Sequence, residues 1–126
     1  MGLYLNGLNI RPDLLLSSPA NRALTTAKKI ATIIGYTSQV ATDDRIYHAG
    51  SSSLLSVVQD QDDQMDSLML FGHNPGFTDF ANALANENID NIPTAGACQI
   101  DFDVQNWNEV DFGKGRMIFF QYPKGL

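Results

Sequence analysis

The sequence has a single cysteine, Cys98, among its 126 residues, which excludes an internal disulfide and leads us to expect a reducing, cytoplasmic compartment. Basic residues are also scarce, since eight Lys and Arg oppose 14 Asp and Glu and give a net charge of −6. This acidity argues against a nucleic-acid partner. No apolar run approaches the ~18 residues that a membrane helix requires, and no basic segment typical of a secretory signal is present, so we expect no membrane partner.

The remaining composition is that of a globular protein, with 44% hydrophobic and 17% charged residues. No internal repeat, low-complexity tract or long linker divides the chain. We therefore expect residues 1–126 to form a single domain with one core.

Apolar spacing predicts strands that alternate with helices, followed by a hairpin at the end of the chain. Helices are expected over residues 3–9, 20–34, 51–59 and 75–86, and strands over residues 13–17, 37–40, 67–71, 98–104 and 116–122. The serines at 51–53 are expected to cap the third helix, and the continuous apolar run at 67–71 predicts a strand covered on both faces. The first of these segments reads as the tail of a helix, with a short strand as the less favoured alternative. The order predicts an α/β fold of three layers, in which a mixed sheet carries helices on both faces.

Two junctions in the chain are built alike, each leading from an apolar strand into a helix. Residues 17–22 follow one apolar run and residues 72–76 follow another. Each junction has a residue suited to cap a helix, Ser18 or Asn74, and then a proline suited to the first helical position. Each junction should therefore present free backbone N–H groups and the positive end of a helix dipole, which favour an anion.

The first junction carries Arg22 and the second carries His73. Both lie beyond the carboxyl ends of strands expected to be parallel, where α/β sheets bind their ligands. An arginine fork, an imidazole and two helix N-termini together predict a phosphate pocket.

Three segments resemble the histidine phosphatase superfamily, which includes the phosphoglycerate mutases. Residues 9–27, with Ser17-Ser18-Pro19-Ala20-Asn21-Arg22 at their centre, resemble the second motif of that superfamily. Residues 72–76 (Gly-His-Asn-Pro-Gly) resemble its late histidine motif, and residues 92–96 resemble a segment common in its short SixA-type branch. The likeness runs from about residue 3 to the C-terminus and implies a phosphoglycerate mutase-like fold.

The resemblance implies a phosphohistidine phosphatase, which hydrolyses a phosphoric monoester or phosphoramidate through a phosphohistidine intermediate. Arg22 would clamp the phosphoryl oxygens and His73 would hydrogen-bond the transferring group. Ser18 and Asn74 are expected mainly as caps and secondarily as phosphate ligands. His48 lies where many relatives carry a general acid, so it is either a proton donor or a surface residue. The implied partners are a phosphorylated protein and inorganic phosphate, and the family needs no cofactor and no metal.

One element of the family pattern is missing. The superfamily nucleophile belongs to an Arg-His-Gly motif at the end of its first strand, whereas the two histidines here, His48 and His73, do not follow an arginine. We therefore expect a chain that lacks the first strand and the start of the first helix, through a misplaced start site, a truncation or a natural loss. Such a chain should be inactive alone, and about 30 to 40 upstream residues, one strand–helix unit, should restore activity.

Two other functions stay open: a non-catalytic module that binds phosphate or a phosphoprotein, and a small-molecule phosphatase of the same superfamily. The shortness of the chain argues against the latter, because those relatives carry inserted lid segments. A missing central strand should also leave unpaired sheet edges. We expect either marginal stability or a gap filled by a second copy, giving a homo-oligomer, or by a rearranged N-terminus.

Overall fold

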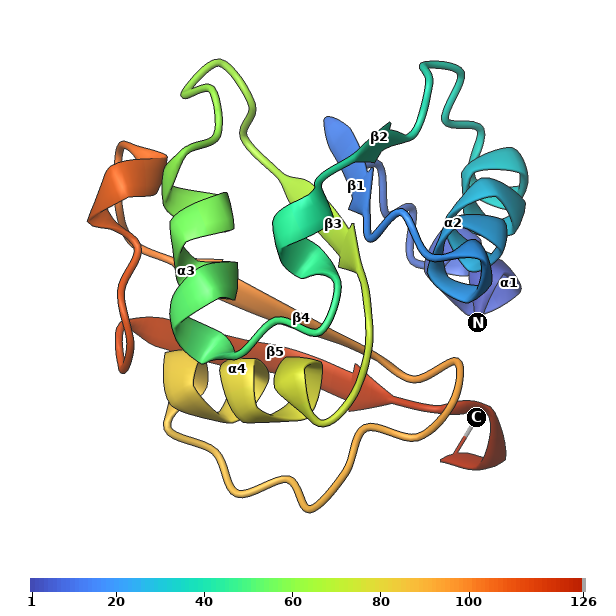
Figure 1. Ribbon diagram of the computed structural model, residues 1–126. Helices are drawn as coiled ribbons and strands as arrows, with labels where there is room; N and C mark the ends of the chain where they lie inside the picture. The colour runs from blue at the N-terminus through green and yellow to red at the C-terminus, as the bar shows by residue number, and fades with distance from the viewer. Residues whose placement is uncertain (126) are drawn as a thin grey trace.

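The computed structural model describes residues 1–125 and shows strands alternating with helices (Figure 1). The helices and strands are α1 (Gly2–Gly7), β1 (Leu14–Ser17), α2 (Asn21–Ile34), β2 (Ala41–Thr42), α3 (Ser51–Gln59), β3 (Leu68–Phe71), α4 (Gly76–Ala85), β4 (Ala97–Phe102) and β5 (Gly115–Gln121). Short 3-10 turns occupy Asp44–Ile46, Trp107–Glu109 and Pro123–Gly125. The predicted α/β fold class and the terminal hairpin are confirmed, and residues 2–7 form a helix rather than a strand.

The strands are divided between two sheets. β1 lies between β2 and β3 in a three-stranded parallel sheet, and β4 pairs with β5 in a two-stranded antiparallel sheet. The hairpin is interrupted by a register shift between Gln99 and Ile100. β3 and β4 are not hydrogen-bonded to each other, so each of the two sheets ends there with an open edge. The unpaired edges expected from the sequence are therefore present.

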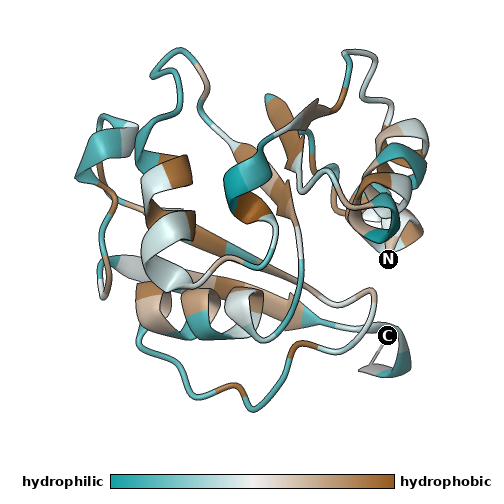
Figure 2. Ribbon diagram, in the orientation of Figure 1, coloured by the Kyte–Doolittle hydropathy of each residue, from teal (hydrophilic) through white to brown (hydrophobic). Residues whose placement is uncertain are grey.

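Helices cover both faces of the parallel sheet, as predicted. α1 and α2 lie on one side, and α3 lies on the other, with α4 against the hairpin (Figure 1). Because side chains alternate along a strand, Leu15 packs with α1 and α2, while Leu16 packs with α3 and α4. Figure 2 shows the matching pattern, with brown strands inside and teal loops outside.

The helix α2 follows the predicted periodicity closely. Its buried residues recur three or four positions apart and form one apolar face: Ala23, Ala27, Ile30, Ala31 and Ile34. Gly35 ends the helix with φ 76°, a left-handed conformation that glycine adopts without strain. This long helix is what holds Arg22 at a fixed position beside the end of β1.

Three local predictions are wrong. The weak strand expected at residues 37–40 forms instead at Ala41–Thr42, where the chain reaches Leu16 and Ser17. α3 has Gly50 at its N-cap, and no side chain of Ser51–Ser53 caps it. The strand at residues 67–71 was expected to be buried on both faces, yet of β3 only Phe71 is buried, because β3 has a neighbour on one side alone.

Candidate functional site

The first junction runs from β1 into α2. Ser18 is fully buried and donates its N–H to the carbonyl of Phe71 at 2.9 Å, so it continues the pairing of β1 with β3. Its Oγ accepts a hydrogen bond from the N–H of Ala20 at 3.1 Å. The helix begins only at Asn21, with Ala20 as N-cap. The prediction of Ser18 as N-cap and Pro19 as first helical residue is therefore wrong, because sheet pairing holds Ser18 in the strand and delays the helix.

The second junction runs from β3 into α4 and needs glycine at its first position. A Cβ on Gly72 would lie 2.3 Å from Cε1 of Phe77, so a larger residue would displace the ring on which the turn packs. His73 follows directly and is half-buried. Its carbonyl accepts from the N–H of Phe77 at 3.0 Å, which fixes the backbone on both sides of the imidazole.

Asn74 caps α4 with its side chain, although Pro75 is the formal N-cap. Its Oδ1 accepts from the N–H and the hydroxyl of Thr78, at 3.1 Å and 2.8 Å. Its Nδ2 donates to the carbonyl of Ile92 at 2.6 Å and to Oδ1 of Asn91 at 3.3 Å. Since both amide hydrogens are used in this way, the geometry gives no support to Asn74 as a phosphate ligand.

The two junctions meet through a side-chain hydrogen bond. Nε2 of His73 lies 2.9 Å from Oγ of Ser18. Both residues sit at the carboxyl end of the parallel sheet, because Ser17 of β1 is in register with Phe71 of β3. The serine hydroxyl therefore fixes the imidazole next to the beginning of α2, where Arg22 lies.

A third segment, residues 43–50, brings His48 to the same place. The segment is anchored by Arg45, whose guanidinium contacts the carboxylates of Asp43 at 2.8 Å and Asp60 at 2.7 Å. The hydrogen bonds from Arg45 lower the pKa of Asp43 below its usual range. Asp43 and Asp60 thus hold Arg45 from two sides of the segment.

Aromatic contacts continue from this segment to His73. The ring of Tyr47 is centred 4.0 Å from that of His48 and 5.6 Å from that of His73, in an edge-on arrangement with the latter. His48 has φ 54°, a left-handed conformation that is uncommon outside glycine and is found at functional sites. Gly76 permits the close approach of this segment, because a Cβ there would lie 2.1 Å from the carbonyl oxygen of Ala49.

The electrostatic environment favours the neutral form of His73. Burial lowers the pKa of His73 below its usual range, and the positive charges of Arg22 and His48 lower this pKa further. Burial, Arg22 and His48 thus all act in the same direction on the pKa of this imidazole. An anion bound here would relieve that repulsion and would favour protonation of His73.

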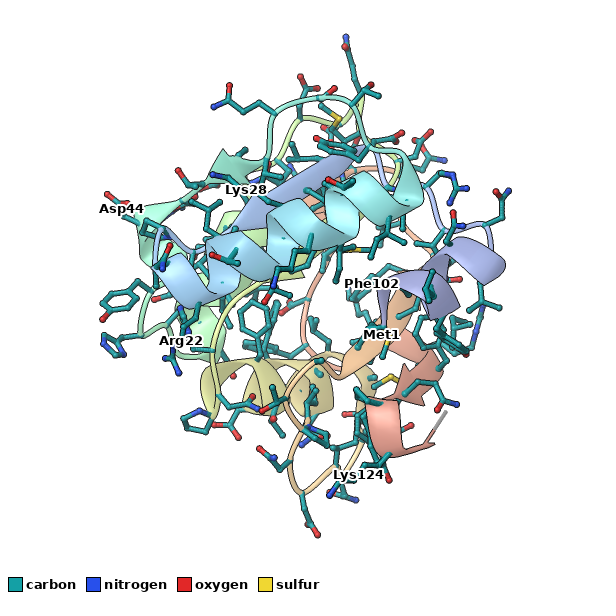
Figure 3. All side chains as sticks on the ribbon, turned by 90° about the vertical axis from the view of Figure 1, so that its right-hand side faces the viewer. Met1, Arg22, Lys28, Asp44, Phe102 and Lys124 are labelled. Carbon is teal, nitrogen blue, oxygen red and sulfur yellow. The ribbon has the colours of Figure 1, made fainter. Side chains whose placement is uncertain are left out.

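Arg22 is exposed at the start of α2, on the left of Figure 3. Its side chain is free of intramolecular ion pairs within residues 1–125. A guanidinium fork, an imidazole and the positive end of a 14-residue helix can together hold a tetrahedral oxyanion. Within the described residues, 1–125, no group of three or more His, Cys, Asp or Glu could ligate a metal.

Of the residues singled out from the sequence, the structure brings Arg22, His73, Ser18 and His48 together, and it turns the Asn74 side chain to other partners. Sequence reasoning missed Tyr47, whose ring lies close to the rings of both histidines. In the sequence, the only indication that Tyr47 belongs to the site is that it directly precedes His48. A single exposed tyrosine forms no periodic pattern from which its place could be predicted.

The similarity of this chain to known proteins was found by comparing structures. No protein-family model and no curated protein matches the chain. Among solved structures, a SixA protein of Agrobacterium tumefaciens assigned as a phosphohistidine phosphatase has a TM-score of 0.75 and 26% identity, over 97% of this chain and 75% of that one. A second SixA protein so assigned, from Nakamurella multipartitia, has a TM-score of 0.69 and 18% identity, over 97% and 77%. None of the helices in residues 1–125 has both the length and the apolarity that a bilayer crossing requires.

Proposed function

We propose that this chain, whose fold is that of the SixA-type histidine phosphatases, binds the phosphoryl group of a phosphorylated protein as part of a phosphohistidine phosphatase. The observation that carries the proposal is the convergence of Arg22 and His48 on His73 at the carboxyl end of the parallel sheet. Because the chain has a net charge of −6, a site for an anion must gather its positive charge locally.

Each residue then has a defined role. Arg22 binds two phosphoryl oxygens through its fork. His73 takes up a proton as the anion binds and donates a hydrogen bond to a third oxygen, which stabilises the charge that develops during transfer. Ser18 positions the imidazole through its 2.9 Å contact with Nε2. We assign to His48 the role of proton donor to the leaving group.

The 126 residues contain no Arg-His-Gly sequence, so a nucleophile of the family type is not supplied by this chain. We therefore expect the chain alone to bind a phosphorylated protein without hydrolysing it. The same observation favours a second function, a non-catalytic phosphate-binding module. Both functions predict binding, and they differ in whether a histidine supplied from elsewhere turns binding into hydrolysis.

Phosphate binding provides the first test. Inorganic phosphate should raise the melting temperature of the protein, and calorimetry should show tighter binding at pH 6 than at pH 8 because His73 takes up a proton. Arg22→Ala or His73→Ala should weaken binding by about 10- to 100-fold, the effect of losing one charge-assisted hydrogen bond. Lys29→Ala, which removes a cation further along the same helix, is the matched control and should bind normally. Wild-type affinity in Arg22→Ala would refute the site.

Turnover provides the second test. Phosphoimidazole and a phosphohistidine-bearing protein should remain phosphorylated when mixed with the chain, as followed by ³¹P NMR. Hydrolysis that disappears in His73→Ala would contradict the expected inactivity and would require a nucleophile within these residues. His48→Gln should raise the pKa of His73, because one of the positive charges that lower it is gone.

A further inference from the structure

The longest stretch of the chain without an acidic residue runs from Leu14 to Thr42 and contains α2. These 29 residues include three cations, Arg22, Lys28 and Lys29, and so have a net charge of +3. The other 97 residues have five Lys and Arg against 14 Asp and Glu, a net charge of −9. Because all three cations belong to α2, this helix forms a positive surface that begins at the phosphate pocket.

The cations of α2 are exposed and have no acidic neighbours on the helix. Arg22, Lys28 and Lys29 all lie on its solvent side. An acid three or four positions away would stabilise each of them, yet those positions hold only uncharged residues. Within residues 1–125, both ion pairs are made by Arg45 instead. The three charges on α2 are therefore available to a binding partner.

Lys29 extends the phosphate pocket along the helix. It lies about 10 Å beyond Arg22 along the axis and on the same side of α2, because seven residues make almost two full turns. In an extended polypeptide, about 10 Å corresponds to about three residues. When Arg22 holds a phosphoryl group, an acidic side chain about three residues away in the same segment therefore reaches Lys29.

Lys28 lines a separate hollow of about 330 Å³ between α2 and β2. Its other lining residues are uncharged: Leu24, Gln39, Val40, Ala41 and Thr42. The hollow lies on the side of α2 away from α1, because Lys28 is above the helix in Figure 3 whereas Met1, at the start of α1, is below it. A carboxylate in this hollow pairs with Lys28 without meeting an acidic residue.

We propose that Lys28, Lys29 and this hollow form a docking surface for an acidic segment of the phosphorylated protein whose phosphoryl group Arg22 holds. The proposal rests on the proposed function and adds which phosphoproteins are bound, namely those with Asp or Glu about three residues from the phosphorylated side chain. The rest of the chain, with a net charge of −9, repels such a segment, so charge complementarity orients the partner over the pocket.

The probe is a pair of capped peptides with phosphohistidine at the centre, used at pH 8 because phosphoramidates hydrolyse in acid. One peptide has aspartate three residues before and three residues after the phosphohistidine, and its matched control has asparagine at both positions. In about 50 mM salt the aspartate peptide should bind about fivefold more tightly in calorimetry, the effect of two exposed ion pairs. In about 0.5 M salt this preference should disappear, because surface charges are then screened.

Two double variants locate the docking surface. Lys28→Gln combined with Lys29→Gln should make the affinities for the two peptides equal, and it should leave the affinity for inorganic phosphate unchanged within about twofold. The matched control combines Lys114→Gln with Lys124→Gln, which removes two exposed cations outside α2. This control has the same change in net charge and should keep the preference for the aspartate peptide.

The outcomes separate the docking surface from the proposed function. If the wild-type chain binds inorganic phosphate but binds both peptides equally, the docking surface is overturned and the phosphate pocket stands. A preference that survives in the Lys28 and Lys29 double variant, or that is lost to the same extent in the Lys114 and Lys124 control, also overturns the docking surface alone. If the wild-type chain binds neither phosphate nor either peptide, the proposed function is wrong and the docking surface is overturned with it.

Discussion

Gly76 offers the sharpest test of how the site is held together. It begins α4, and a Cβ there would lie 2.1 Å from the carbonyl oxygen of Ala49. A Cβ atom essentially never lies closer than 3.0 Å to such an atom, so in Gly76→Ala the segment that carries His48 must retreat by at least 0.9 Å, the difference between these distances. Overpacking of this kind costs about 1–3 kcal/mol. In urea this loss lowers the unfolding midpoint by about 1 M.

The same substitution should be visible at His73. Moving His48 away weakens one of the positive charges that depress the pKa of His73, so this pKa should rise toward its ordinary value. The chain has only two histidines, and their ring protons can be followed separately by NMR. Gly7→Ala is the control, because no atom lies within 4 Å of the added Cβ, and it should not lower the unfolding free energy. Wild-type stability and an unchanged titration of His73 in Gly76→Ala would refute this packing.

Three further predictions concern single side chains. Ser18→Ala should lower the unfolding free energy by about 1–3 kcal/mol, because it removes a buried hydroxyl that is hydrogen-bonded to the N–H of Ala20 and to His73. The control Ser53→Ala, at an exposed position, should change the unfolding free energy by under ~0.5 kcal/mol. The unfolding free energy should fall as the pH drops below about 6.5, because the pKa of His73 is lower in the folded protein and the unfolded chain therefore takes up the proton first. In urea titrations of His73→Gln, this part of the pH dependence should be absent. Burial raises the pKa of Cys98 to about 11, so iodoacetamide at pH 8 should modify it far more slowly in the folded protein than in urea; equal rates would contradict its placement.

Local patterns in the sequence were sufficient for most elements. The period of α2 and its glycine stop, the alternation of β4 and the apolar run of β3 each depend on residues within a few positions of one another. The predictions were wrong where contacts with residues far apart in the chain set the bounds of an element. Pairing with Phe71 keeps Ser18 in the strand, and contact with Leu16 places β2 at Ala41–Thr42 rather than earlier.

The candidate site shows the same division. Arg22 and His73 were recognisable because each lies where a strand gives way to a helix, a signal contained in a few consecutive residues. Their functional roles stay predictions until phosphate binding is measured. The contribution of Tyr47 and the diversion of Asn74 to Ile92 depend on segments far apart in the chain, which no local pattern records.

The sequence by itself determined the α/β order of elements, the acidity of the chain and the two strand-to-helix junctions, because backbone preferences and side-chain periodicity act over short distances. Only the tertiary structure decided that these junctions meet through Ser18 and His73, and that Arg45 anchors the segment bearing His48. It also decided that β4 and β5 form a sheet separate from β2, β1 and β3, because pairing between strands depends on contacts between segments far apart in the chain.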